Sequence, residues 1–455
     1  MLHSPVSRCL LILATCTWGC QSYSPRPLSR SSIDEALRAP GLQTLSDVSE
    51  AIDHPFLPST TVDASNGIDA FEAACLAVVL NPELRVARTR RGLFAAQLVQ
   101  AGLLPNPQIS ASVDRPVGGS TAGTVNAYGL GVGWDLPAII EHSANLGAAR
   151  AQDRSAALDL AWQEWQIATA ACLAITQAAW MQRSCDVLGE AVIQSTVLLA
   201  ELQRALNEGE ATSLEVAAAK STLQSYTAQL RASERSADLA IQFAKRTIGI
   251  APNAWLVPAT ATHLPMTSVD VDAAFEAARR SRIDLAAFRA GYEAQEERVR
   301  AAVLAQFPRM SIGLNASRDT GDVQTIGLGV SIDLPIFDRA QGRIAIERAT
   351  REQLFAEYVS REFTLRADLD AIRSELDRLV PEIEAQLEYL DDVEAAVAIA
   401  EQNAAANVVD AFAVEQARAE AVSARLVALS LERRRAELAV AWIATCGTFE
   451  EGQPR

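Results

Sequence analysis

Hydrophobic and polar positions alternate with period two in a few short stretches of this chain, and these stretches occur as two pairs. Apolar residues alternate with Ser, Gly and Asp over 109–114 and 129–136, and with Ser, Gly, Asn and Asp over 311–317 and 326–333. One apolar and one polar face is typical of strands, and the Gly-containing segments between the runs favour turns. The pattern predicts two β-hairpins, at 108–136 and 309–334.

The remaining patterned stretches have helical spacing. They run from about 66 to 105, from about 138 to 208 and on to about 248, and then over about 268–306, 336–406 and 412–445. A helix of about 70 residues is about 105 Å long. We therefore expect a mainly α fold with a small β part, in which each hairpin lies between a helix of about 35–40 residues and a much longer one. Pro381 is expected to kink the second long helix.

The two halves are copies of one another. Pro107 and Pro308 are 201 residues apart, whereas Asp135 and Asp333, like Leu214 and Phe412, are 198 apart. The offset changes inside the hairpin loop, where an insertion is easily tolerated. A nearly constant offset over about 180 residues indicates an internal duplication.

The ends of the chain differ in composition from the repeats. Residues 1–20 contain one Arg and a short apolar core and end at Cys20, the layout of a signal peptide, with small residues before a cysteine as in a lipoprotein signal. The sequence thus predicts lipidation at Cys20, with cleavage without a lipid as the alternative. The predicted organisation is a Ser/Pro-rich tether at 21–65, repeat 1 at 66–250, a Pro-containing linker at 251–267, repeat 2 at 268–446 and a tail at 447–455.

Composition excludes several classes of function. The formal net charge of -16 and the pI near 4.9 argue against a nucleic-acid partner. After the leader there is no run of 18 apolar residues, so no membrane-spanning helix is expected. The four His residues have no metal-ligand spacing, and phosphate-loop, nucleophile-elbow and dinucleotide motifs are absent. We therefore expect no enzyme activity, no metal and no cofactor. The cysteines of the repeats are interpreted as buried small hydrophobes, with a Cys75–Cys446 bridge left open.

Several short motifs, in order and duplicated, give the chain a family resemblance over about 66–446. They are Asn81-Pro82-Glu83-Leu84, Leu104-Pro105-Asn106-Pro107, Asp333-Leu334-Pro335-Ile336-Phe337-Asp338 and the segment 209–216. With these motifs the chain resembles the TolC-type outer-membrane efflux factors. The resemblance implies a homotrimer in which each chain gives four strands to a twelve-stranded β-barrel and its helices to a periplasmic tunnel. It also implies an exit duct for efflux or type I secretion, working with a periplasmic adaptor protein and an inner-membrane pump.

The resemblance also assigns faces and tips. The lipid-facing strand residues are expected to be Leu130, Val132, Trp134, Ile326, Leu328, Val330 and Ile332, and the lumen-facing ones Ser110, Ser112, Asp114, Asn315 and Ser331. Asp135 and Asp333 are expected either to line the lumen or to cap the bend into the following helix. Two helix-turn-helix breaks, near 209 and 408, would be the periplasmic tips that contact the adaptor, through Gly209, Ser213, Leu214, Asn407 and Asp410.

Two readings from the residues alone remain beside this one. The hairpins could pack one face on a soluble core, and the chain could be a lipid-anchored periplasmic coiled-coil tether without a pore.

Overall fold

The computed structural model describes residues 22–36, 62, 66–260, 270–406 and 411–449. The chain divides into two compact units, Met1–Pro40 and Gly41–Arg455. The described part of the first unit contains the short helix α2 (Arg30–Ala36), which lies within the predicted tether. The Ser29 hydroxyl accepts a 3.3 Å hydrogen bond from the Ser32 amide and satisfies one N–H group of the first turn. Cys20 lies outside the described residues.

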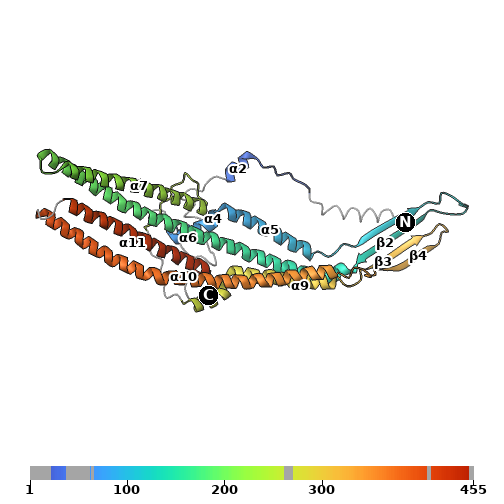
Figure 1. Ribbon diagram of the computed structural model, residues 1–455. Coiled ribbons are helices and arrows are strands. Elements are labelled where there is room, and N and C mark those ends of the chain that lie inside the picture. The colour runs from blue at the N-terminus through green and yellow to red at the C-terminus, as the bar shows by residue number, and fades with distance from the viewer. Residues whose placement is uncertain (1–21, 37–61, 63–65, 261–269, 407–410, 450–455) are drawn as a thin grey trace. The chain divides into compact units, whose positions relative to one another are not determined.

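Both predicted hairpins form, and they join into one antiparallel sheet with the strand order β1-β2-β3-β4. The strands are β1 (Gln108–Asp114), β2 (Ala127–Asp135), β3 (Met310–Arg318) and β4 (Gln324–Ile332). The second strand of repeat 1 pairs with the first strand of repeat 2, with Val132 opposite Leu314. Figure 1 shows the sheet at one end of the long helices, with the two hairpins side by side.

Four long helices make up most of the second unit. They are α6 (Leu136–Glu208), α7 (Ser213–Ile248), α10 (Gln341–Ala405) and α11 (Ala411–Cys446). The 73 residues of α6 correspond to about 110 Å. The helix α10 continues through Pro381, which removes one backbone hydrogen bond without ending the helix. Helix α6 packs against both α7 and α11, and α10 packs against α11, so that the two repeats share one bundle.

Each helix that precedes a hairpin is broken in two, whereas the sequence pattern predicts a continuous helix in each repeat. Repeat 1 has α4 (Ala70–Leu80) and α5 (Pro82–Gly102). Proline lacks an N–H group and disfavours helical geometry in the residue before it. Asn81 accordingly has φ −59° and ψ 125°, and its side chain accepts a 2.8 Å hydrogen bond from the Glu83 amide. The break is therefore encoded by the Asn-Pro pair.

Repeat 2 has the same break without a proline, between α8 (Val271–Ser281) and α9 (Ile283–Leu304). Arg282 has φ −61° and ψ 126°. Its guanidinium bonds both carboxylate oxygens of Asp284, at 2.9 and 2.8 Å, and donates to the Thr445 carbonyl at 2.9 Å. A fork of arginine hydrogen bonds thus fixes the second break.

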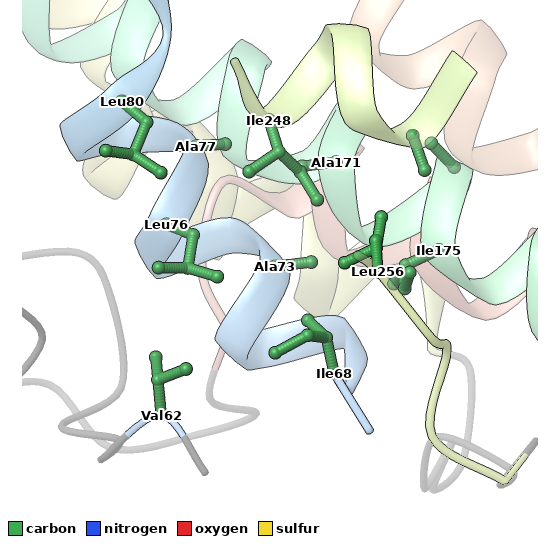
Figure 2. Close-up of a cluster of buried hydrophobic side chains, with 12 residues drawn as sticks. Val62, Ile68, Ala73, Leu76, Ala77, Leu80, Ala171, Ile175, Ile248 and Leu256 are labelled. Carbon is green, nitrogen blue, oxygen red and sulfur yellow. The ribbon is translucent and has the colours of Figure 1, made fainter. Parts of the chain in front are cut away.

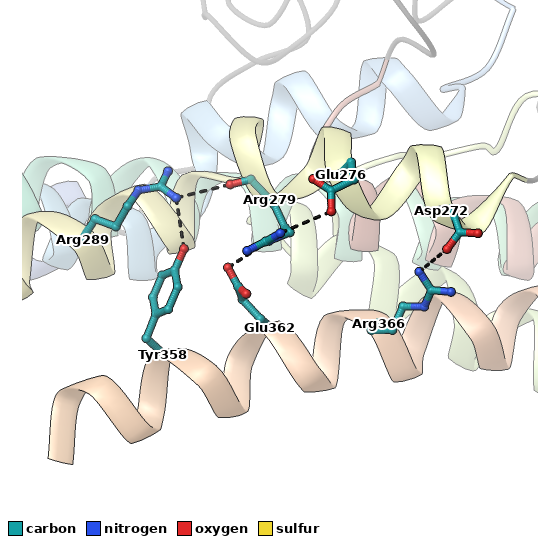
Figure 3. A network of polar contacts seen from close by, with 7 residues as sticks. All are labelled: Asp272, Glu276, Arg279, Arg289, Tyr358, Glu362 and Arg366. Carbon is teal, nitrogen blue, oxygen red and sulfur yellow. Dashed lines mark hydrogen bonds and ion pairs between the residues drawn. The ribbon is translucent and has the colours of Figure 1, made fainter. Parts of the chain in front are cut away.

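A charged network joins α8 to α10 on the outside of repeat 2 (Figure 3). The Arg366 guanidinium bonds Asp272 at 2.6 Å, and Arg279 bonds Glu276 and Glu362, each at 3.2 Å. In contrast, α4 of repeat 1 is almost wholly buried. Figure 2 shows its apolar side chains facing α6, α7 and the segment after α7, in a cluster that includes Leu76, Ile175, Ile248 and Leu256.

The passage from hairpin to long helix also differs between the repeats. Helix α6 begins at Leu136, directly after β2, whereas residues 333–340 separate the end of β4 at Ile332 from the start of α10 at Gln341. The helical pattern in the sequence predicts that the second long helix begins at about 336. Ala340 has φ +59°, the left-handed region, and this turn delays the start of the helix.

The cysteines of the repeats behave as predicted for buried small side chains, except for the half-exposed Cys446. No disulfide joins Cys75 to Cys446. The Cys172 thiol donates to the Ala70 carbonyl at 2.9 Å, and burial raises the pKa of the Cys75 thiol to about 11. Thiols in such surroundings stay protonated and unreactive.

Candidate functional site

The first candidate site is the apolar face of the sheet, which carries every residue predicted to face lipid. The register aligns Ile109, Val132, Leu314 and Leu328 across all four strands, so their side chains share one face. This face is open in the single chain, with Ile326 87% exposed and Leu328 69% exposed. An apolar surface that crosses four strands marks a contact with lipid or protein.

The predicted lumen-facing residues share the opposite face. Ser110, Gly131, Asn315 and Gly327 are aligned across the sheet, and Ser112 lies opposite Gly129. A Cβ atom on Gly131 would come within 2.6 Å of the Ser110 Oγ and 2.8 Å of the Asn315 Oδ1. The short polar side chains therefore lie over the glycines of their neighbours. Asp114 and Ser331 are on this face as well, nearer to the strand ends.

Two amphipathic aromatic residues lie toward the two ends of the apolar face on β2. Tyr128 is 47% exposed and Trp134 is 41% exposed. The Trp134 indole N–H donates to the Pro105 carbonyl at 2.8 Å, so its polar atom is satisfied while the ring stays on the surface. In membrane proteins, Tyr and Trp are enriched at the membrane–water interfaces, because one end of the ring is apolar and the other is wet.

The two aspartates at the hairpin ends do not act as side-chain caps. Asp135 occupies the N-cap position of α6 but makes no capping hydrogen bond with its side chain. Asp333 lies well before α10, and its amide donates to the Arg309 carbonyl at 2.8 Å. Asp135 is aligned with Ser311, and Ser311 with Ser331, on the polar face of the sheet. This arrangement favours the lumen-lining alternative for Asp135.

The second candidate site is the turn between α6 and α7, the predicted first tip. Gly209 has φ +81°, a left-handed conformation that glycine adopts readily, and the amide of Glu210 donates to the Ala205 carbonyl at 2.8 Å. Thr212 and Glu215 form a capping box at the start of α7. Hydrogen bonds from Thr212 lower the pKa of the Glu215 carboxyl. The Thr-x-x-Glu spacing is a readable signal for this cap, which the sequence analysis did not use.

The structure describes only some of the tip residues that are predicted to contact a partner. Ser213 and Leu214 begin α7, and Leu214 is 77% exposed. Asn407 and Asp410 lie outside the described residues. Phe412, the counterpart of Leu214 in repeat 2, is 54% exposed. Both α7 and α11 therefore carry an exposed apolar side chain in their first turn.

Glu415 is near the second tip in the sequence, but its side chain faces the helix bundle. It is half-buried, and its Oε1 accepts a 3.4 Å hydrogen bond from the Ser195 hydroxyl of α6. Burial raises the pKa of the Glu415 carboxyl, and the Arg418 charge partly offsets this. By contrast, Glu208 and Glu210 are exposed at the first turn.

Within the described parts of the chain, no group of three or more His, Cys, Asp or Glu side chains is arranged to hold a metal ion. Within the described residues, no helix is both long enough and apolar enough to cross a bilayer.

Comparison with known proteins relates this arrangement to membrane channels. Residues 274–447 match the family model of the outer membrane efflux proteins. No curated protein matches the chain significantly.

Solved structures match over most of the chain. The outer membrane protein VceC of Vibrio cholerae has 19% identity and a TM-score of 0.69, over 84% of this chain and 97% of its own. The CmeC outer membrane channel of Campylobacter jejuni has 15% identity and a TM-score of 0.68, over 96% of each chain. The outer-membrane channel OprN has 18% identity and a TM-score of 0.68, over 95% of this chain and 99% of its own. These likenesses show a shared fold. In sequence, the resemblance to the outer membrane efflux proteins covers residues 274–447 of this chain.

Proposed function

We propose that this chain forms the exit duct of an efflux or type I secretion system in the outer membrane. In this proposal three copies assemble into a passive conduit, with the sheets forming a β-barrel in the lipid and the helices forming a tunnel through the periplasm. The chain supplies no reaction chemistry, and an inner-membrane pump with a periplasmic adaptor protein drives transport. Cys20 would add a lipid anchor.

The observation that carries the proposal is the incomplete sheet. It has only four strands, its apolar face is exposed, and β1 and β4 have no partner on their outer edges within the described chain. An exposed apolar face is unfavourable in water. Open strand edges are unfavourable in water and in lipid, because their backbone groups lack hydrogen-bond partners. Pairing β1 of one copy with β4 of the next removes the edges. Three copies give twelve strands, enough to enclose a lumen.

The two faces of the sheet then have different surroundings. The apolar face, with Leu130, Val132, Trp134, Ile326, Leu328, Val330 and Ile332, would contact lipid. The Ser- and Gly-rich face would line the lumen, where its short side chains leave the wall smooth. The tips, with Gly209, Ser213 and Leu214 at the first, would meet the adaptor and gate the conduit.

Planar-bilayer recording tests this function. The purified chain is expected to give discrete conductance steps, whereas a lipid-anchored tether without a pore would give none. Sustained absence of conductance from protein that is folded and membrane-associated would overturn the proposal.

A matched pair of variants sharpens the test. Leu328→Arg puts a charge on the lipid face and is expected to cost about 2–4 kcal/mol of insertion free energy per copy. Gly327→Arg puts the same charge on the adjacent residue of the other face, where a Cβ atom meets nothing within 4 Å. We expect Leu328→Arg to abolish insertion and Gly327→Arg to preserve it. Equal effects of the two would contradict the face assignment.

A further inference from the structure

The segment between β4 and α10, residues 333–340, is named here the junction loop. Its counterpart in repeat 1, 198 residues earlier, begins with the same Asp-Leu-Pro triplet but enters α6 at once. Repeat 2 therefore has a loop where repeat 1 has a helix. The loop is not explained by the barrel or the tunnel, both of which need only strands and helices.

The junction loop exposes apolar side chains to an unusual degree. Leu334 is 73% exposed, Ile336 is 65% exposed and Phe337 is 92% exposed. The equivalent of Phe337 in repeat 1 is Ile139, which is only half-exposed within α6. Three large apolar side chains within four residues form a patch that water solvates poorly.

Three polar side chains in the loop or at the start of α10 form hydrogen bonds with the backbone of the loop. Asp338 accepts a 2.9 Å hydrogen bond from the Ala340 amide. Gln341 accepts one from the Arg339 amide at 2.6 Å and donates to the Phe337 carbonyl at 3.1 Å. Arg339 donates to the Pro335 carbonyl at 3.3 Å. These hydrogen bonds fix a loop conformation in which the apolar side chains are exposed. In an ordinary solvated loop, the polar side chains would be the exposed ones.

The position of this patch indicates what covers it. Leu334 continues the alternation of Val330 and Ile332, so the patch extends the exposed apolar face of β4 toward the helices. Arg309 and Arg339 are exposed beside it. A guanidinium group binds phosphate through paired hydrogen bonds, and apolar side chains beside basic ones are typical of segments at the headgroup level of a bilayer.

We propose that the junction loop anchors the chain in the periplasmic leaflet of the outer membrane. In this arrangement Leu334, Ile336 and Phe337 enter the boundary between headgroups and acyl chains, and Arg309 and Arg339 face lipid phosphates. The loop lies in the plane of the membrane and does not span it. The inference rests on the proposed function, since it takes the apolar face of β4 to be in lipid. The competing occupant is a second copy of the chain.

Photo-crosslinking from position 337 tests the anchor. Phe337 is replaced by p-benzoylphenylalanine, which its exposure should tolerate, and the full chain is reconstituted into vesicles of phosphatidylethanolamine and phosphatidylglycerol. After irradiation, mass spectrometry separates lipid adducts from chain-to-chain adducts. We expect mainly lipid adducts at this position.

Two further positions keep the outcomes distinct. The same probe at Leu328 reports on the strand face, and at Phe412 it reports on an apolar residue at the tip, 54% exposed, where no lipid adduct is expected. Lipid adducts at 328 with mainly chain-to-chain adducts, or none, at 337 would overturn the anchor and leave the proposed function standing. Lack of lipid adducts at both 328 and 337 would overturn both. Equal lipid labelling at 337 and 412 would also refute a specific anchor.

Discussion

The two helix breaks, at Asn81 in repeat 1 and at Arg282 in repeat 2, have nearly the same backbone angles but are held by different chemistry. In each repeat the side chain of the break residue donates to a threonine carbonyl at the end of the last helix, Thr247 at 2.8 Å and Thr445 at 2.9 Å. These threonines are 198 residues apart, the offset of the repeat. The duplication has thus kept a contact geometry while the residues that make it changed.

A second pair of contacts supports this conclusion. Arg88 donates to the Val78 carbonyl at 2.7 Å, across the first break. Arg289, 201 residues later, donates to the Arg279 carbonyl at 3.3 Å, across the second (Figure 3). Each arginine therefore joins the two short helices of its repeat. What differs is the setting, since α4 is buried while α8 carries an exposed charged face.

The glycines that end α7 and α11 offer the largest effect for testing this comparison. Gly249 and Gly447 are both left-handed, with φ +92° and +78°. A Cβ atom on Gly249 would come within 2.8 Å of the backbone of Leu80 and Asn81, whereas on Gly447 it would meet the flexible Arg282 side chain at 2.9 Å. Gly249→Ala should lower the free energy of unfolding by about 4 kcal/mol and Gly447→Ala by about 1–2 kcal/mol. Denaturant unfolding followed by circular dichroism measures both. Equal losses would show that the backbone is not packed more closely at the first break than at the second.

Loss of the ion pair at the second break should come next. Arg282 and Asp284 have side chains only 13% and 7% exposed. Asp284→Ala leaves a buried guanidinium without its carboxylate, and we expect a loss of about 3 kcal/mol in the same unfolding assay. The double variant Arg282→Met with Asp284→Leu should recover much of this loss, because it removes both charges. A double variant less stable than the single one would contradict the explanation.

The first break should be less sensitive, because a proline also encodes it. Asn81→Ala removes the cap on the Glu83 amide and the hydrogen bond to the Thr247 carbonyl, and should cost about 1–2 kcal/mol. Thermal unfolding of this variant beside Asp284→Ala gives the ranking. A larger loss for Asn81→Ala would reverse the comparison.

The smallest effect is a pH dependence near the tips. Because the pKa of Glu415 is raised above its ordinary value of 4.5, the folded chain binds more protons than the unfolded chain between the two pKa values. The contribution of the Glu415 carboxyl to stability is therefore most favourable below its pKa in the unfolded chain, and it is lost as the pH rises through its pKa in the folded chain. Glu415→Gln should be more stable than the parent at neutral pH, with the difference fading in acid. Glu210→Gln, at an exposed site, is the control and should show no such trend.

The sequence predicted the features that depend on periodicity. Alternation located both hairpins, helical spacing located the long helices, and the nearly constant residue offset indicated the duplication. It missed the break at Arg282 because the hydrogen bond from Arg282 to the distant Thr445 carbonyl has no local signature. The break at Asn81 had a signal, an Asn before a Pro, that a continuous apolar pattern obscured.

The junction after the second hairpin was missed for a related reason. Asp135-Leu136-Pro137 and Asp333-Leu334-Pro335 are identical, yet a helix follows the first directly and a loop follows the second. Downstream hydrogen bonds of Asp338 and Gln341 decide the difference. The candidate faces of the sheet were predictable because one-sided alternation fixes which residues share a face, whereas alternation carries no information on what each face contacts.

Electron cryo-microscopy of the purified chain in lipid nanodiscs tests the central claim most directly. The account predicts three copies around one axis, with β1 of each copy paired to β4 of the next, the apolar face of the sheet inside the lipid disc and the long helices outside it. A structure in which the sheets lie outside the disc, or in which a single copy leaves β1 and β4 unpaired, would contradict it.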